Sequence, residues 1–421
     1  MSLFIFNISS IVQTEQNPVL FRRGAELSQL NCIQNGYVWI RHGLIHEFGL
    51  YTPEIHAKVR EFSPDIDELD AAGGCVFPSW IDAHTHMVYA GSREGEFVDR
   101  INGLSYEEIA LRGGGILNSA NRLRQTSEEE LLENAIIRLN EIVKMGTGAV
   151  EIKSGYGLSI DSELKMLRVI RQLKTFSPIE IKATFLGAHA LPLEYKNNKD
   201  GYIDLLINTI MPQIRDEDLA DYCDVFCERN YFTKEDTVKI LKAASKNGMQ
   251  GKIHAEQLSH SGGIEAGVEC DAISVDHLEY ANENDIQLLQ NSKVIPVLLP
   301  GAQLFLGLQN PPARKMIENN LPVALSSDFN PGSCPSGNMN QMVSLACILY
   351  KMTPEEAINA ATINSAAAMG LSNSHGSIAV GKKANLFITP PIPSYSFLPY
   401  YFGQNLIRTI VLNGMIHSFD E

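Results

Sequence analysis

Residues 76–86, which read Val76-Phe77-Pro78-Ser79-Trp80-Ile81-Asp82-Ala83-His84-Thr85-His86, form an apolar run that ends in two histidines separated by one residue. Alternate side chains of an extended strand point to the same face, so His84 and His86 are placed to enter one cavity. Histidine nitrogens on a shared face are typical ligands of a transition metal. We therefore expect this stretch to begin the domain that carries the chemistry.

Further along the chain, short runs rich in β-branched residues alternate with helical segments. This alternation is typical of a parallel sheet wrapped by helices. Ser127 and Thr353 stand where N-cap residues would start two of the helices. The pattern predicts a closed (β/α)₈ TIM barrel of the α/β class, with strands at residues 76–81, 149–153, 179–186, 222–227, 251–255, 272–276, 294–299 and 323–326.

Both ends of the chain show short strands and tight turns instead of this alternation. Residues 37–40 and 44–48 predict a hairpin, and the Asn413-Gly414 pair predicts a second hairpin near the C-terminus. Further strands are expected at residues 377–380, 385–388, 409–412 and 415–417. We expect residues 1–75 and 377–421 to meet in one small composite β-sandwich domain, with the barrel at residues 76–376 between them.

The composition restricts the classes of partner. The 421 residues carry a formal net charge of −15 and contain no basic block, which argues against nucleic acid and anionic membranes as partners. A small anionic substrate would then need a local arginine. The 7 cysteines are too few for a disulfide framework and fit a reducing compartment. No secretory signal or membrane-length apolar stretch is evident, so we expect a cytoplasmic protein.

The ends of the predicted strands carry an unusual concentration of histidines. In barrels of this kind the active site lies at the C-terminal ends of the strands. Five of the 11 histidines, together with one aspartate, occupy such positions: His84, His86, His189, His254, His277 and Asp328. Side chains collected there by chance would be of miscellaneous types, so this concentration predicts a functional site.

Four of these side chains suit a metal ion. His84, His86 and His254 offer imidazole nitrogens and Asp328 offers a carboxylate oxygen, a set that binds a divalent or trivalent transition metal such as zinc or iron. Such an ion lowers the pKa of a bound water from about 16 toward about 7, which indicates hydrolytic chemistry. The fourth predicted strand ends without a lysine that could bridge two metals as a carbamate. We therefore expect one metal ion per chain.

These motifs resemble those of the amidohydrolase superfamily, in the Asp-Ala-His-Thr-His sequence after an apolar strand, the later strand-end histidines and the final aspartate. Five further segments are similar to the imidazolonepropionase family within it: residues 89–93, 151–157, 185–189, 254–257 and 327–333. Members of that family hydrolyse 4-imidazolone-5-propanoate to N-formimidoyl-L-glutamate in histidine degradation. The resemblance also implies a homodimer.

The resemblance implies roles for residues around the metal. Arg93 would pair with the propionate carboxylate, because a guanidinium binds both oxygens of a carboxylate at once. Tyr156 and His189 would hold the imidazolone ring and its carbonyl group. The remaining substrate contacts would come from Gln257, Asn330, Gly332 and Ser333.

Proton transfer leaves an alternative open. His277 and the metal would stabilise the charge that develops on the carbonyl oxygen, and Asp328 would accept the proton of the water. In some relatives an acidic residue occupies the position of Gln257, which cannot ionise. Glu256 precedes it, and if the strand continues, alternation places Glu256 on the face of His254. The general base therefore stays open between Asp328 and Glu256.

Two rival functions deserve a test. Another mononuclear metal hydrolase, such as a deaminase of a heteroaromatic ring, would release ammonia, whereas lactam hydrolysis opens the ring without it. Arg93 favours a substrate with an acidic side chain, which nucleobases lack. A non-catalytic scaffold protein would have lost metal ligands, yet all four candidates are present.

Overall fold

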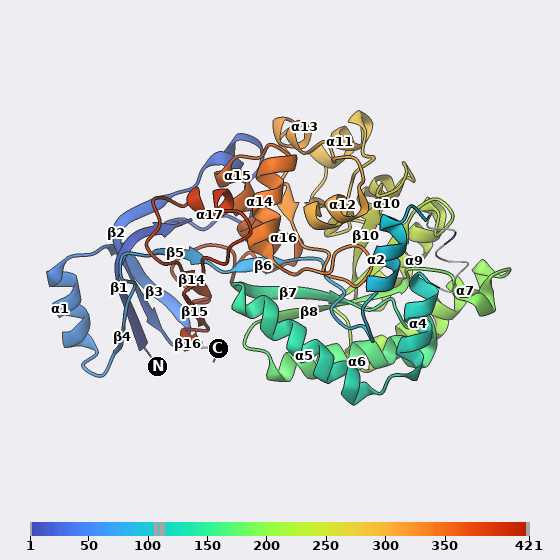
Figure 1. Ribbon diagram of the computed structural model, residues 1–421, viewed down its shortest axis with the longest axis horizontal. Coiled ribbons are helices and arrows are strands. Elements are labelled where there is room, and N and C mark those ends of the chain that lie inside the picture. The colour runs from blue at the N-terminus through green and yellow to red at the C-terminus, as the bar shows by residue number, and fades with distance from the viewer. Residues whose placement is uncertain (1, 105–107, 109–113, 418–421) are drawn as a thin grey trace.

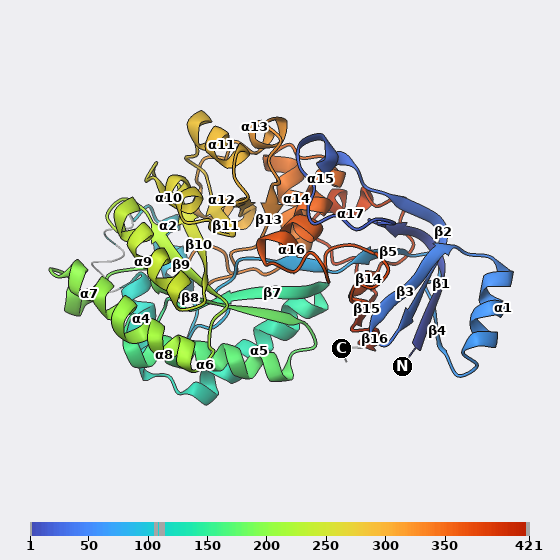
Figure 2. The ribbon, with the colours of Figure 1, turned by 180° about the vertical axis from the view of Figure 1, so that it is seen from behind.

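The structure is a computed structural model that describes residues 2–104, 108 and 114–417. Its strands form two eight-stranded sheets. Figure 1 shows the sheet built from the two end segments of the chain beside the larger sheet and its surrounding helices. The view from behind in Figure 2 shows the same arrangement. None of the helices in these described ranges has the length and apolar character that crossing a membrane requires.

The larger sheet is a barrel of parallel strands that follow one another in chain order. Its closure joins the segments after the first and last strands, where Thr85 and Phe329 form a parallel bridge and the His86 amide donates to the Phe329 carbonyl at 2.9 Å. The predicted (β/α)₈ barrel is confirmed. Its strands are β6 (Trp80–Asp82), β7 (Thr147–Lys153), β8 (Glu180–Ala188), β9 (Tyr222–Cys227), β10 (Gln250–Ala255), β11 (Ser274–His277), β12 (Ile295–Leu298) and β13 (Ala324–Leu325).

Helices surround this barrel, and the predicted starts at Ser127 and Thr353 are confirmed, since each side chain accepts a hydrogen bond from the third residue that follows it. The longer helices are α1 (Pro53–Phe62), α2 (Glu94–Ile101), α4 (Ile116–Gln125), α5 (Glu128–Lys144), α6 (Ile160–Phe176), α9 (Lys234–Lys246), α11 (Glu283–Gln290) and α14 (Met339–Leu349). The shorter ones are α7 (Lys199–Leu205), α8 (Met211–Asp216), α10 (Gly263–Glu269), α12 (Pro300–Leu306), α13 (Ala313–Glu318), α15 (Pro354–Asn359), α16 (Ser365–Ala368) and α17 (Phe397–Tyr400). Single turns of other helix types lie at η1 (Gly24–Ser28), η2 (Leu193–Tyr195), η3 (Leu206–Ile210) and η4 (Ala360–Asn364).

The smaller sheet combines strands from both ends of the chain, in the order β16-β15-β14-β5-β1-β2-β3 with β4 beside β1. It curls until Leu44 of β3 bridges Lys383, just before β14, and it encloses an apolar core. The predicted sandwich therefore takes the form of one curled sheet. Its strands are β1 (Ser2–Val12), β2 (Cys32–Arg41), β3 (Leu44–Leu50), β4 (Asp67–Asp70), β5 (Cys75–Pro78), β14 (Leu386–Ile388), β15 (Thr409–Leu412) and β16 (Met415–His417).

Two strand predictions are wrong in detail. Residues 76–81 form two strands, because the chain changes partner at Ser79: β5 pairs with β14 in the small sheet, and β6 pairs with β7 in the barrel. Residues 377–380 form no strand, and only Ile378 makes a bridge there, to Thr14. The division of the chain into domains at residues 75/76 and 376/377 stays a prediction.

A buried polar cluster fastens the N-terminal segment to the barrel. The Gln13 amide donates to Asn359 at 2.9 Å, and its carbonyl oxygen accepts from Thr362 at 2.7 Å. Asn364 donates to the backbone carbonyl of Arg22 at 2.9 Å. These bonds hold the segment between β1 and β2 against the helices that follow β13.

Candidate metal centre

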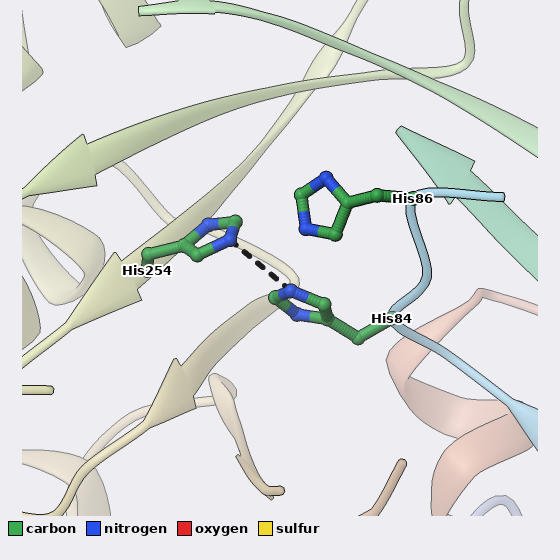
Figure 3. Close-up of side chains that lie close together, drawn as sticks. All are labelled: His84, His86 and His254. Carbon is green, nitrogen blue, oxygen red and sulfur yellow. Dashed lines mark hydrogen bonds between the residues drawn. The ribbon is translucent and has the colours of Figure 1, made fainter. Parts of the chain in front are cut away.

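Four predicted ligands converge at the C-terminal mouth of the barrel. His84 and His86 follow β6, His254 lies in β10, and Asp328 follows β13. His84 Nε2 lies 3.1 Å from His254 Nε2, and Asp328 Oδ1 lies 3.6 Å from the Nε2 atoms of both His84 and His86. Figure 3 shows the three imidazoles facing one another. All four side chains are buried.

The tautomers of two histidines provide a test of whether a cation fits. His84 Nδ1 lies 2.6 Å from Asp276 Oδ2, and His254 Nδ1 lies 3.0 Å from Asp224 Oδ2. The first contact is a hydrogen bond, whereas the second is a close approach without hydrogen-bond alignment. Because a lone pair on Nδ1 would repel a carboxylate oxygen at either distance, each Nδ1 carries the proton and each Nε2 carries a lone pair. Two lone pairs at 3.1 Å repel each other unless a cation binds both. The residues therefore fit a metal ion.

The spacing and the protonation of the ligands agree with this fit. Atoms about 2.1 Å from a tetrahedral ion are about 3.4 Å apart, close to the observed range of 3.1 to 3.6 Å. Burial, followed by the charge of Lys153, holds the pKa of His84 well below its usual value. Burial and His189 do the same to the pKa of His86. Neutral imidazole is the form that binds a metal.

His277 stands beside these ligands at the end of β11. Ligand atoms of His277, His84 and Asp328 lie within 4.8 Å of one another, so the structure also brings His277 to the centre. Its Nδ1 atom lies 3.9 Å from Glu279 Oε1. Burial alone would lower the pKa of His277, but Glu279 reverses this effect and the net direction is upward. His277 is thus suited to donate a hydrogen bond at the mouth.

A network of buried charges lies beneath the ligands, and its members were not predicted as site residues. Lys153 Nζ is 2.7 Å from Glu151 Oε1 and 2.8 Å from Asp224 Oδ2, and Lys252 Nζ is 2.6 Å from Glu151 Oε2. Asp276 completes the set behind His84. The signal was present in the sequence, because Glu151 and Lys153, like Lys252 and His254, are two residues apart and so share a strand face.

Arg93 lies against the loop that follows β13. Its Nε and Nη2 atoms donate to Glu96 Oε2 at 2.9 and 2.5 Å. A Cβ atom added to Gly332 would lie 2.3 Å from Arg93 Nη1, so any larger residue there would displace the guanidinium from its present position. The structure thus brings together Arg93 and one of the predicted substrate-binding residues.

Tyr156 and His189 border the predicted metal ligand His86. The His189 ring stacks on the His86 ring with centroids 5.4 Å apart. The Tyr156 ring lies 5.6 Å from His189 and 5.8 Å from His86. Burial, helped by the neighbouring His254, lowers the pKa of His189 to about 3. Both side chains therefore form a neutral aromatic wall beside the predicted metal position.

Asn330 and Ser333 form hydrogen bonds within their own loop. Asn330 Oδ1 accepts from the amides of Gly332 and Ser333 at 2.7 and 2.8 Å, and its Nδ2 donates to Ser333 Oγ at 2.6 Å. Ser333 Oγ in turn donates to Asp328 Oδ2 at 2.9 Å. The loop therefore holds one carboxylate oxygen of Asp328 in place while the other faces the imidazoles.

Glu256 lies elsewhere than strand alternation predicted. Strand β10 ends at Ala255, and Glu256 adopts a left-handed φ of 49°, which turns its side chain away from the direction of the strand. Its carboxylate accepts from the amides of Gly263 and Ile264 at 2.9 and 3.1 Å, at the start of α10. The expectation that Glu256 shares the face of His254 is wrong. Gln257 follows in the same turn and is 7% exposed.

Comparison with known proteins identifies the family. The Amidohydrolase family pattern matches residues 228–416. An imidazolonepropionase of Christiangramia forsetii is 53% identical over 99% of this chain and 100% of its own length. One of Flavobacterium johnsoniae is 54% identical with the same coverage. The chain belongs to the imidazolonepropionase family.

Solved structures place this member of the imidazolonepropionase family among more distant proteins of the same fold. The Escherichia coli guanine deaminase superposes with a TM-score of 0.75 at 14% identity and covers 100% of both chains. A triazine hydrolase variant gives 0.73 at 14% identity, over 99% of this chain and 94% of its own. At such low identity the likeness shows the barrel and its companion sheet alone.

Membership in the amidohydrolase family, unlike these distant structures, implies a single metal ion per site, as the sequence predicted.

Proposed function

We propose that this protein is an imidazolonepropionase that hydrolyses the lactam C–N bond of 4-imidazolone-5-propanoate and yields N-formimidoyl-L-glutamate in histidine degradation. The observation that carries the proposal is the combination of a metal-ligand set with an arginine at the same mouth of the barrel. Relatives named imidazolonepropionase, which are more than half identical to this chain along their full length, support it.

In this proposal His84, His86, His254 and Asp328 hold one zinc or iron ion. The bound ion would lower the pKa of a coordinated water and polarise the lactam carbonyl. Asp276 and Asp224 keep the Nδ1 protons of His84 and His254 in place, so that both Nε2 lone pairs face the centre.

Arg93 would bind the propionate carboxylate of the substrate. Its guanidinium lies against Gly332 and faces the same loop that anchors Asp328. Tyr156 and His189 would hold the imidazolone ring beside His86. Gln257, in the turn after β10, would form a hydrogen bond with the substrate. Asn330 and Ser333 would present the loop's backbone groups, because their side chains already bond within the loop.

Proton transfer would run through Asp328 and His277. Asp328 has one oxygen fixed by Ser333 and the other beside the imidazoles. This geometry suits a base that would accept the proton of water and then give it to the ring nitrogen released when the C–N bond breaks. His277 would donate to the carbonyl oxygen as negative charge develops on it. The Glu256 carboxylate already accepts hydrogen bonds from two backbone amides at the start of α10, which favours Asp328 over Glu256 as the general base.

The test follows freshly prepared 4-imidazolone-5-propanoate by loss of its ultraviolet absorption, beside metal analysis of the same protein. The proposal expects ring opening without ammonia and about one zinc or iron ion per chain. Release of ammonia from a heteroaromatic ring would favour a deaminase instead. A homodimer in the cytoplasm completes the proposal, and sedimentation analysis of the purified protein checks the dimer.

A further inference from the structure

We propose that Lys153 is the positioning residue that holds the two carboxylates behind the metal-binding imidazoles, and thereby sets metal affinity. The inference rests on the proposed metal site and adds a residue to it. It concerns metal binding, so its test is independent of which substrate the protein hydrolyses.

Lys153 points from β7 into the interior of the barrel and is completely buried. Its ammonium group faces three carboxylates, with Glu151 Oε1 at 2.7 Å, Asp224 Oδ2 at 2.8 Å and Asp276 Oδ2 at 3.8 Å. An ammonium has three N–H donors and no acceptor. One side chain therefore serves the carboxylates of three different strands.

Two of these carboxylates each stand behind a different metal-binding imidazole. Asp224 Oδ2 lies between Lys153 and His254 Nδ1, at 2.8 and 3.0 Å. Asp276 Oδ2 lies between Lys153 and His84 Nδ1, at 3.8 and 2.6 Å. The same oxygen atom thus contacts the lysine and the ring in both cases. Moving Lys153 changes the position of both rings through their carboxylates.

The second oxygen of each carboxylate is held by a fixed group. Asp224 Oδ1 accepts from the His254 amide at 3.1 Å, and Asp276 Oδ1 accepts from Ser274 Oγ at 2.6 Å. One oxygen of each carboxylate is thus held by a strand, β10 for Asp224 and β11 for Asp276, and the other oxygen faces Lys153. Without the ammonium, these two like charges would share a buried space with no lysine in contact with either, and such an arrangement strongly favours rearrangement.

Lys252 provides a matched control in the same network. It is also completely buried, and its Nζ atom contacts Glu151 Oε2 at 2.6 Å and the backbone carbonyls of Ala83 and Ala368 at 3.0 and 3.3 Å. Among the described residues, Glu151 is its only ion-pair partner. Lys252 has the same charge and burial as Lys153 but contacts neither carboxylate that orients an imidazole.

The experiment measures zinc affinity of metal-free protein by competition with a chromophoric chelator, for wild type, Lys153→Met and Lys252→Met. We expect Lys153→Met to weaken zinc binding about 10- to 100-fold, the usual effect of losing a group behind a metal ligand. Lys252→Met should weaken it by less than about threefold. The zinc-induced rise in Tm, measured for each variant against its own metal-free form, should decrease in the same order.

Equal zinc affinities for Lys153→Met and wild type would overturn the proposal, and so would an equal loss in both methionine variants. Lys153→Gln, which keeps a hydrogen-bond donor without the charge, serves if Lys153→Met does not fold, and it should weaken zinc binding by at least tenfold. Failure of both Lys153 variants to fold while Lys252→Met folds would assign Lys153 a structural role and overturn the positioning role. Normal zinc binding without hydrolysis of the imidazolone would contradict the proposed function and leave this inference intact.

Discussion

The interiors of the two sheets are chemically opposite. Inside the barrel, five charged side chains beneath the predicted metal ligands are completely buried: Glu151, Lys153, Asp224, Lys252 and Asp276. The small sheet encloses aliphatic side chains such as Ile5, Ile40 and Ile388. Each of these five side chains has an oppositely charged partner among the others, because an unpaired buried charge is very unfavourable.

This difference indicates which property each region controls. A substitution in the barrel network that deprives Asp224 or Asp276 of a partner disturbs a metal-facing imidazole, so it acts first on metal binding. A substitution in the small sheet leaves a cavity, so it acts on the free energy of unfolding. The following predictions separate these two outcomes, from the largest expected effect to the smallest.

His84→Ala should have the largest effect. It removes a predicted metal ligand and leaves Asp276 without its imidazole partner. We expect loss of bound metal and a decrease in kcat of at least about 10³-fold, because activated water would no longer be supplied. Metal analysis and the absorption assay check this result. Full metal content with normal turnover would remove His84 from the centre.

Ile40→Ala should separate stability from chemistry. Ile40 is buried in the core of the small sheet, and truncation of such a side chain costs about 2–5 kcal/mol of unfolding free energy. Denaturant unfolding measures this loss. Metal content and kcat of the folded variant should match those of wild type. A loss of metal would show that the two interiors are coupled.

Arg93→Lys should affect substrate binding alone. Lysine keeps the charge but loses the planar donor pair, so we expect KM to rise about 10- to 100-fold while kcat and metal content change little. Arg122→Lys is the control, since Arg122 contacts the neighbouring backbone carbonyl of Ser92. Equal KM values for Arg93→Lys and wild type would exclude the carboxylate-binding role.

His375→Asn should have the smallest effect, visible only in acid. His375 is buried, and its Nε2 atom has no hydrogen-bond partner within the described ranges, unlike the carboxylate-backed His84. Burial and Lys383 lower its pKa to about 4. The unfolded chain, with a histidine pKa near 6.5, therefore takes up a proton that the folded state excludes, and stability falls as pH decreases from 6.5 toward 4.

At pH 5 this histidine should cost the wild type about 1–2 kcal/mol relative to pH 7. Denaturant unfolding of both proteins at the two pH values measures the difference, and His375→Asn should lose less stability on acidification than wild type. An identical pH dependence of the two proteins would show that His375 is protonated in the folded state or accessible to solvent.

Sequence patterns succeeded where local signals and tertiary structure agree. The strand at 222–227 and the Asn413-Gly414 hairpin have the expected bounds, because β-branched runs and turn residues specify them locally. The convergence of His84, His86, His254 and Asp328 followed from the rule that strand ends meet at one mouth. The set of candidate ligands could therefore be assembled without a structure.

The errors occurred where a partner elsewhere in the chain decides the conformation. The change of sheet at Ser79 depends on its backbone hydrogen bond to Asn385. Asn385 lies far away in the sequence, so the residues around Ser79 do not reveal this pairing. The direction of Glu256 depends on a left-handed backbone at the strand end and on free amides at α10. The role of Asp276 required knowledge that its strand stands behind His84. The alternation of side chains along a strand does not reveal which distant residues pack against it.

Anomalous diffraction from crystals of the metal-loaded protein, collected at the zinc and iron absorption edges, tests the central claim most directly. We predict one peak per chain at the barrel mouth, bonded to nitrogen atoms of His84, His86 and His254 and to an oxygen of Asp328. Two peaks at the mouth, or one peak that lacks these ligands, would contradict the account.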